Sequence, residues 1–151
     1  MDQITKQKPF VTPLAHIKSE KGDVKHGIKS SEKSFYGFGE AYFSSVNYQM
    51  IKGWKLHRDM TLNLIVPHGS IRFIVHDGRE KINRISPLID IVLGNSNYSR
   101  LTIPPGFWVA FEGIGQGSNL LLNVASIEHD HSEAKNKPLD YFKIRGFAGN
   151  E

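Results

Sequence analysis

The stretch Ser70-Ile71-Arg72-Phe73-Ile74-Val75-His76 decides the fold class of this chain. Side chains alternate between the two faces of a β-strand, so the apolar odd-numbered residues of this stretch share one face. Arg72, Ile74 and His76 share the other face. Alternation of this kind is typical of a strand with one buried face, and it predicts a β-strand over residues 70–77.

Short segments of similar character recur on both sides of this strand, separated by residues that favour turns. Pro67-His68-Gly69 precedes the strand, and Pro104-Pro105-Gly106 follows further along the chain. The pattern predicts strands at Phe38–Ser44, Tyr48–His57, Met60–Val66, Ser70–Asp77, Leu88–Leu93, Arg100–Ile103, Trp108–Gly113, Asn119–Ala125 and Tyr141–Ile144. Short strands with a turn about every 8–12 residues are typical of an all-β sandwich or barrel.

The chain of 151 residues has the size of one domain with one hydrophobic core. Residues 1–33 are polar and interrupted by prolines, which predicts a mostly irregular N-terminal arm with a short strand around Leu14–Ile17. Residues 34–145 hold the predicted strands, and residues 146–151 form a tail. The charged segment His129–Asp140 has room for one helical turn.

Composition excludes several classes of protein and site. The absence of cysteine excludes disulfides and thiolate metal sites, and it fits a reducing cytoplasm. No apolar run approaches the roughly 20 residues of a membrane-spanning helix, and the N-terminus lacks the apolar middle of a signal peptide. The net charge of +4 lies partly in the arm and suits a diphosphate ligand. These features predict a soluble cytoplasmic protein that binds neither membrane nor nucleic acid.

Three segments, in order, carry a resemblance to a known family. Residues 52–59 read Lys-Gly-Trp-Lys-Leu-His-Arg-Asp, residues 60–79 carry a strand pair ending in Asp77-Gly78-Arg79, and residues 101–111 contain Ile103-Pro104-Pro105-Gly106-Phe107. This order resembles the RmlC-like cupins, namely the dTDP-4-dehydrorhamnose 3,5-epimerases and related dTDP-sugar ketoisomerases. The resemblance implies a cupin-type jelly roll, a homodimer, and a nucleotide-sugar pocket inside the barrel.

The resemblance also implies a division of catalytic roles. In the 3,5-epimerases a histidine removes a proton beside the sugar ketone, a lysine stabilises the enolate, and a tyrosine returns a proton from the opposite face. A weakly acidic C–H needs both a positioned base and a partner for the developing oxyanion. By this match His57 takes the place of the base. Leu62, Val109 and Leu122 stand at the other functional positions, which leaves a different reaction or a binding role open.

The neighbours of His57 give a second argument for a catalytic role. If the strand alternates, Lys55, His57 and Asp59 project to one side, and Leu56 and Arg58 to the other. In such a group Asp59 would hold the imidazole tautomer, and Lys55 would polarise a ketone oxygen. We therefore expect Lys55, His57 and Asp59 to be the catalytic residues.

Further polar and aromatic residues are candidates for binding the nucleotide sugar: Glu40, Asn47, Arg58, Arg72, His76 and Trp108. Glu40 and Asn47 roughly match nucleotide contacts that the resemblance implies. Arg58 and Arg72 carry the charge that a diphosphate needs. His76 shares the polar face of its strand, and the Trp108 ring has the shape to stack on a base or a sugar.

The same region argues against a metal. Metal-dependent cupins ligate their ion with His-x-His, a following Glu and a later His. Here His57 could supply the first ligand, and Asp59 is an unusual second. The remaining positions fall at Leu62 or Asn63 and at Val109. Because a divalent metal needs several convergent nitrogen or oxygen ligands, we expect neither a metal nor another cofactor.

These observations favour a nucleotide-sugar epimerase or ketoisomerase that acts on a dTDP-4-keto-6-deoxyhexose. The enzyme would serve the synthesis of a surface polysaccharide such as lipopolysaccharide and would transfer protons through His57 without a metal. A non-catalytic cupin that binds a sugar nucleotide or carbohydrate is the first alternative. A metal-dependent cupin enzyme is the second.

Overall fold

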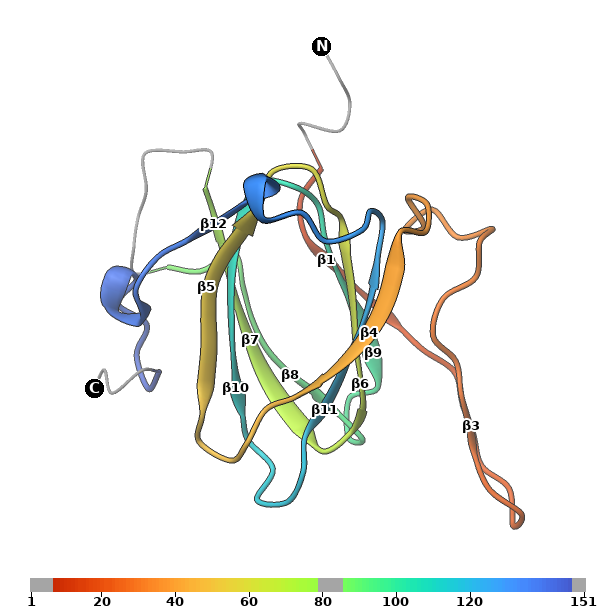
Figure 1. Ribbon diagram of the computed structural model, residues 1–151. Coiled ribbons are helices and arrows are strands. Elements are labelled where there is room, and N and C mark those ends of the chain that lie inside the picture. The colour runs from red at the N-terminus through yellow and green to blue at the C-terminus, as the bar shows by residue number, and fades with distance from the viewer. Residues whose placement is uncertain (1–6, 79–85, 148–151) are drawn as a thin grey trace.

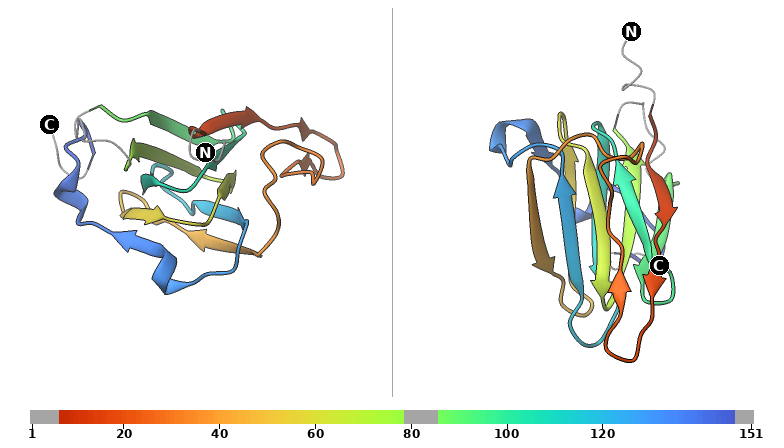
Figure 2. Two further views of the ribbon diagram at one scale, coloured as in Figure 1. Left: turned by 90° about the horizontal axis from the view of Figure 1, so that it is seen from above. Right: turned by 90° about the vertical axis from the view of Figure 1, so that its right-hand side faces the viewer.

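The computed structural model of the protein describes residues 7–78 and 86–147. Residues 1–6 of the predicted arm, Arg79 and residues 148–151 of the predicted tail lie outside the described residues. In the described part of the chain, two five-stranded antiparallel sheets face each other, as Figures 1 and 2 show. The predicted all-β sandwich is confirmed.

Each sheet combines strands that are distant in sequence. The first sheet contains, in spatial order, β1 (Phe10–Pro13), β9 (Ser99–Ile103), β6 (Leu62–His68), β11 (Leu120–Ala125) and β4 (Glu40–Ser45). The second contains β12 (Ala134–Asn136), β5 (Ile51–His57), β10 (Phe107–Gly113), β7 (Ser70–Asp77) and β8 (Ile89–Gly94). A small sheet pairs β2 (His16–Ile17) with β3 (Val24–Lys25). Residues 7–78 and 86–147 also contain two short 3-10 turns, η2 (His131–Glu133) and η3 (Leu139–Tyr141).

The alternation that predicted β7 is confirmed by the burial of its side chains. Ile71, Phe73 and Val75 are fully buried in the core between the two sheets. Burying such side chains stabilises the sandwich by about 1.5–3 kcal/mol each. The opposite face of the second sheet is also covered, because residues after η3 lay Phe142 and Ile144 across it.

The segment Tyr141–Ile144 was expected to be a strand, and the structure shows otherwise. Its first residue ends η3, and the next three residues form no strand. Their role is to cover the outer face of the second sheet, where Phe142 packs at 4.6 Å from the ring of Trp54. The helical turn expected within His129–Asp140 is present as η2.

The N-terminal residues form part of the fold. β1 pairs with β9 at the edge of the first sheet. The β2–β3 hairpin then projects away from the sandwich (Figures 1 and 2). Residues 27–34 return across the outer face of the first sheet, where the buried guanidinium of Arg100 donates hydrogen bonds to the Gly27 carbonyl and to Glu32. Among the described residues, no helix is long and apolar enough to cross a membrane.

Candidate active site between the two sheets

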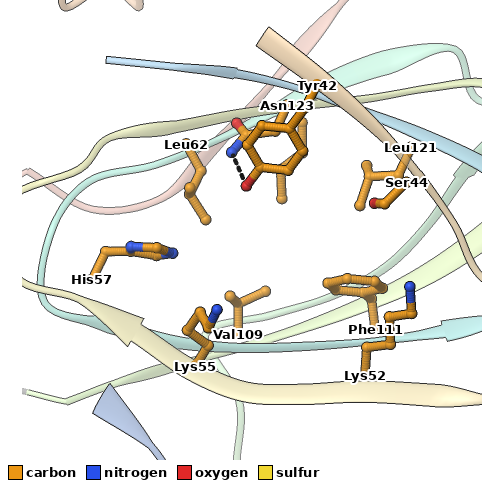
Figure 3. Close-up of a pocket in the computed structure, with 11 residues that line it drawn as sticks. Tyr42, Ser44, Lys52, Lys55, His57, Leu62, Val109, Phe111, Leu121 and Asn123 are labelled. Carbon is orange, nitrogen blue, oxygen red and sulfur yellow. Dashed lines mark hydrogen bonds between the residues drawn. The ribbon is translucent and has the colours of Figure 1, made fainter. Parts of the chain in front are cut away.

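A cavity of about 200 Å³ opens between the two sheets, and side chains from both sheets line it (Figure 3). Its polar lining residues are Tyr42, Ser44, Lys52, Lys55, His57 and Asn123. Its apolar lining residues are Leu62, Leu64, Val109, Phe111 and Leu121. The mixture of apolar walls with a few convergent polar groups is typical of a site for a small molecule.

A bulge in β5 decides which of its residues reach the cavity. Lys55 lies opposite Val109, but Ala110 lies opposite Gly53, so Trp54 is an extra residue in the pairing with β10. Because of this extra residue, the alternation of side chains before the bulge is shifted by one residue relative to that after it. Lys52 therefore joins Lys55 and His57 on the inner face.

The bulge depends on a glycine and on the packing of the extra residue. Gly53 has φ +131°, and a Cβ atom there would lie 2.7 Å from the Cα of Ala110, so a larger residue does not fit. Trp54 is fully buried on the outer face, where its indole N–H donates a 3.1 Å hydrogen bond to the carbonyl of Leu139.

His57 is held by a buried carboxylate from a distant part of the chain. Oε1 of Glu133, the last residue of η2, accepts a hydrogen bond from Nδ1 of His57. The other carboxylate oxygen accepts the backbone N–H groups of Asp59 at 3.1 Å and Met60 at 3.3 Å. With Nδ1 engaged, Nε2 at the far end of the ring is free to act as a base in the cavity (Figure 3).

Glu133 remains ionised in spite of its burial. Burial alone would raise the pKa of this carboxyl group, but the hydrogen bonds from His57 and from the two backbone N–H groups outweigh it. The pKa of Glu133 therefore lies below its usual value. A buried anion next to Nδ1 stabilises the imidazolium that forms when Nε2 accepts a proton.

The opposite wall of the cavity presents a phenol. Tyr42 on β4 lies directly across from Asn123 on the neighbouring strand β11. The amide nitrogen of Asn123 donates a 3.1 Å hydrogen bond to the Tyr42 oxygen, drawn as a dashed line in Figure 3. Tyr42 is 42% exposed, so its ring borders the open side of the cavity rather than its depth.

The structure separates the three expected catalytic residues. Lys55 and His57 line the cavity, as the alternation predicted. Asp59 does not join them, because β5 ends at His57 and the Asp59 side chain is exposed. The carboxylate that contacts the imidazole is Glu133, and Asp59 contributes only its backbone N–H to that carboxylate.

Three of the expected ligand-binding residues lie near the rim of the sandwich and do not line the cavity. Glu40 accepts the backbone N–H of His129 at 3.1 Å. Asn47 is exposed in the turn between β4 and β5. Arg58 is exposed, and its guanidinium donates to the carbonyl of Ser132.

The other three lie on the outer face of the second sheet, because they alternate with the core residues of their strands. Arg72 forms a two-pronged ion pair with Asp90, with both distances 2.8 Å. His76 is buried and stacks on Phe142, with ring centroids 4.1 Å apart. Trp108 packs in the same cluster. Alternation correctly placed Arg72 and His76 on the same face of β7, but it did not show that the C-terminal segment covers this face.

Glu133, Tyr42, Ser44 and Asn123 were not expected from sequence. Glu133 lies in a charged segment whose composition is typical of an exposed turn. Only its contact with His57 in the structure distinguishes it from the exposed acidic residues of that segment. The resemblance implied a tyrosine at the position of Leu122, and Tyr42 lies on the strand next to the one that carries Leu122. Cross-strand pairing, which single-sequence patterns do not reveal, brings Tyr42 to the cavity.

No group of three or more His, Asp or Glu side chains in residues 7–78 and 86–147 is arranged to hold a metal ion. Leu62 and Val109, which stand where metal-dependent cupins have ligands, both line the cavity with apolar surface. The described lining residues therefore favour acid–base chemistry by His57 over metal ligation.

Comparisons with known proteins identify the family of this chain. Residues 8–145 match the model of the family described as "FdtA: WxcM-like, C-terminal". The structure of a dTDP sugar isomerase from Desulfovibrio desulfuricans G20 is 36% identical, with a TM-score of 0.80, and the match covers 88% of this chain and 85% of that one. The sequence and the structure thus point to the same family.

Two more distant relatives carry less weight. A probable low-salt glycan biosynthesis epimerase of Haloferax volcanii is 24% identical over 102 residues, which span 67% of this chain but only 65% of that protein. The structure of QdtA, a sugar 3,4-ketoisomerase from Thermoanaerobacterium thermosaccharolyticum in complex with TDP, is 18% identical, with a TM-score of 0.70. The match covers 91% of this chain and 93% of that one, and at this identity it shows a similar fold only. The fold and the family match together show that this chain belongs to the WxcM-like, C-terminal (FdtA) family of cupin-type proteins.

Proposed function

We propose that this protein is an isomerase or epimerase of a nucleotide-linked 4-keto sugar that works by proton transfer at carbon. The pairing of His57 with the buried Glu133 at the wall of a substrate-sized cavity carries this proposal. It combines an imidazole whose Nε2 faces the cavity with a fixed anion at Nδ1 that stabilises the protonated ring. The family match and the 36% identical dTDP sugar isomerase support the substrate class.

In the proposed reaction, Nε2 of His57 takes a proton from the carbon beside the ketone. The C–H electron pair forms a carbon–carbon double bond, and the ketone oxygen becomes an enolate. Lys55 projects from the same strand and supplies the positive charge for that oxygen. In epimerisation, Tyr42 on the other wall gives its hydroxyl proton to the opposite face of the same carbon, and the C=O bond re-forms. In ketone migration, the enolate oxygen takes the proton of the neighbouring hydroxyl group, the former ketone carbon takes the proton from Tyr42, and the neighbouring carbon becomes the ketone. In both cases the proton held by His57 then passes to the tyrosinate, so both residues return to their starting states.

The diphosphate of the nucleotide would lie near Lys52. Its ammonium group donates a 2.7 Å hydrogen bond to the carbonyl of Ser45 at the edge of β4, so it stands between the two sheets. The net charge of +4 favours an anionic ligand in general. The reaction would serve glycan synthesis, in line with the haloarchaeal relative. We place it in the cytoplasm, which fits a chain without cysteine.

Non-catalytic binding of a sugar nucleotide is the second candidate, and one observation favours it. Leu62 and Val109 line the cavity at positions where the resembled epimerases place functional groups. A pocket that has lost those groups could retain affinity while its chemistry is lost. Catalysis and binding must therefore be measured separately.

The test is exchange of solvent deuterium into dTDP-4-keto-6-deoxyglucose, followed by NMR, in the parent protein and in His57→Asn. Removal of a general base lowers rates about 10²–10⁴-fold, so we expect exchange in the parent and loss of that size in the variant. Binding of dTDP, measured by calorimetry, should be nearly unchanged. Binding without exchange in the parent would favour the second candidate, and equal exchange in His57→Asn would remove His57 from the mechanism.

A further inference from the structure

The amide of Asn123 can adopt only one orientation in this structure. Its Oδ1 accepts the backbone N–H of Asn63 on the adjacent strand β6 at 3.2 Å. If the amide were flipped, its NH₂ group would face that N–H group, and two donors would meet. The NH₂ group must therefore point the other way, towards the oxygen of Tyr42 at 3.1 Å.

This orientation determines the role of the Tyr42 hydroxyl. Because Asn123 is the donor in their hydrogen bond, the Tyr42 oxygen is the acceptor, and its own hydrogen cannot point at the amide. Figure 3 shows the tyrosine oxygen on the cavity side, next to the amide and facing the wall that carries His57. The hydroxyl hydrogen is left for a group inside the cavity.

We propose that Asn123 is a positioning residue that directs the Tyr42 O–H into the cavity, so that Tyr42 acts as the proton donor and His57 as the base. The inference rests on the proposed function. It adds how the Tyr42 hydroxyl is oriented, because the hydrogen bond from Asn123 leaves the hydroxyl hydrogen for the cavity. Asn123 itself need not touch the substrate for this role.

A buried hydrogen-bond network behind Asn123 holds it in place. The side-chain oxygen of Asn63 accepts the Thr102 hydroxyl at 2.6 Å, and its amide donates to the carbonyl of Ser34 at 3.0 Å. The Ser34 hydroxyl in turn accepts from Arg100 at 2.7 Å. Asn63, Thr102 and Arg100 are all at most 3% exposed. These hydrogen bonds between buried groups restrict the side chains that they join to one arrangement.

The test is the isosteric change Asn123→Asp, which keeps the acceptor for the Asn63 N–H and removes the donor to Tyr42. A carboxylate there accepts the tyrosine hydrogen and turns it away from the cavity. We expect kcat for the exchange reaction to fall at least tenfold, with KM changed less than threefold. The matched control is Phe43→Leu, at the next residue of β4, whose side chain is 63% exposed, and it should retain the parental kcat.

A double-mutant cycle separates positioning from general damage. If Asn123 acts through Tyr42, the change Asn123→Asp should have no further effect on kcat in a Tyr42→Phe background. Multiplicative losses in the double variant would overturn the proposal, as would an unchanged kcat in Asn123→Asp. A thermal melting temperature close to that of the parent would show that the loss is not due to unfolding.

A spectroscopic arm keeps this inference separate from the proposed function. In protein labelled with ¹³Cζ-tyrosine, the Tyr42 signal is the one that disappears in Tyr42→Phe. Asn123→Asp should shift that signal, because the hydroxyl changes from acceptor to donor, and Phe43→Leu should leave it in place. If the chemical shift of the Tyr42 signal is unchanged in Asn123→Asp, the positioning role is overturned even if the enzyme is active. Absence of exchange in the parent, with a shifted signal, would instead remove only the proposed function.

Discussion

Nδ1 of His57 is hydrogen-bonded to Oε1 of Glu133, although the two residues are 76 positions apart in the chain. The contact joins the last residue of β5 to η2, and both side chains are at most 8% exposed. Backbone N–H groups from the segment after β5 complete the shell of the carboxylate. The end of β5 and the C-terminal segment are thus linked through one buried anion.

Replacement of this anion should affect both catalysis and stability. In Glu133→Gln the imidazolium loses its negative partner, so we expect kcat for proton exchange to fall about 10–100-fold. The amide NH₂ would also face the N–H groups of Asp59 and Met60, and the free energy of unfolding should fall by about 1–3 kcal/mol. The control is Glu128→Gln at an exposed carboxylate. Full activity in Glu133→Gln, measured by the same NMR assay, would contradict this role.

Lys52 should contribute mainly to binding. The bulge places Lys52 on the inner face, further along β5 from His57 than Lys55 is. We expect the diphosphate of the ligand at this distance from His57, and the ketone close to His57. We expect Lys52→Met to weaken dTDP binding about tenfold and to reduce the dependence of Kd on salt, as measured by calorimetry. Lys33→Met removes the same charge from an exposed position. If both variants lose equal affinity, general charge and not Lys52 is responsible.

The ion pair between Arg100 and Glu32 should be a major source of stability for the N-terminal segment. The Arg100 side chain is fully buried, whereas that of Glu32 is 30% exposed. Glu32→Ala leaves a buried charge without its partner, and we expect a loss of about 2–4 kcal/mol in the free energy of unfolding measured in urea. Glu20→Ala, at an exposed carboxylate, should change it by less than about 0.5 kcal/mol. A similarly small change in Glu32→Ala would show that the pair is dispensable.

His76 should make the protein less stable in mild acid. Burial lowers the pKa of His76 to about 4, below the value of about 6.5 for an unfolded histidine. Between these values the unfolded state binds more protons, so the stability contribution present above pH 6.5 is lost as the pH falls towards 4. The loss amounts to about 3 kcal/mol at most.

The measurement is the free energy of unfolding at a series of pH values from 4 to 7. In His76→Phe, which retains a ring to stack on Phe142, the slope in this range should be smaller than in the parent. His68→Gln, at an exposed histidine, should keep the parental slope. An unchanged slope in His76→Phe would assign the acid sensitivity to other groups.

We also expect a homodimer, as the family resemblance implies. The β2–β3 hairpin projects from the sandwich, and its apolar residues Ile17 and Val24 are 53% and 56% exposed. An isolated two-stranded hairpin is marginally stable in water, so a partner subunit is the natural cover for these residues. Light scattering should give twice the chain mass of 17.0 kDa, and Val24→Lys should weaken association. A monomer at all concentrations would contradict this expectation.

Much of the fold could be predicted from the sequence, because the positions of the strands follow from the local alternation of apolar and polar residues. The alternation in Ser70–His76 reports which side chains enter the core, and the turn residues around it mark where each strand ends. The segment around His57 placed Lys55 and His57 on one face for the same reason. The two-residue alternation within one strand can be recognised without knowing which other segments the strand packs against.

Only the tertiary structure decided how the site is completed. Glu133 reaches His57 across 76 residues, and Tyr42 reaches the cavity through the pairing of β4 with β11. The bulge at Trp54 changed the face of Lys52, because one extra residue inverts the alternation before it. His76 was predicted on the correct face of β7, but Phe142 packs over it there, and it does not line the cavity. Periodicity specifies direction within a strand, whereas a catalytic partner is specified by contacts between segments that are distant in sequence.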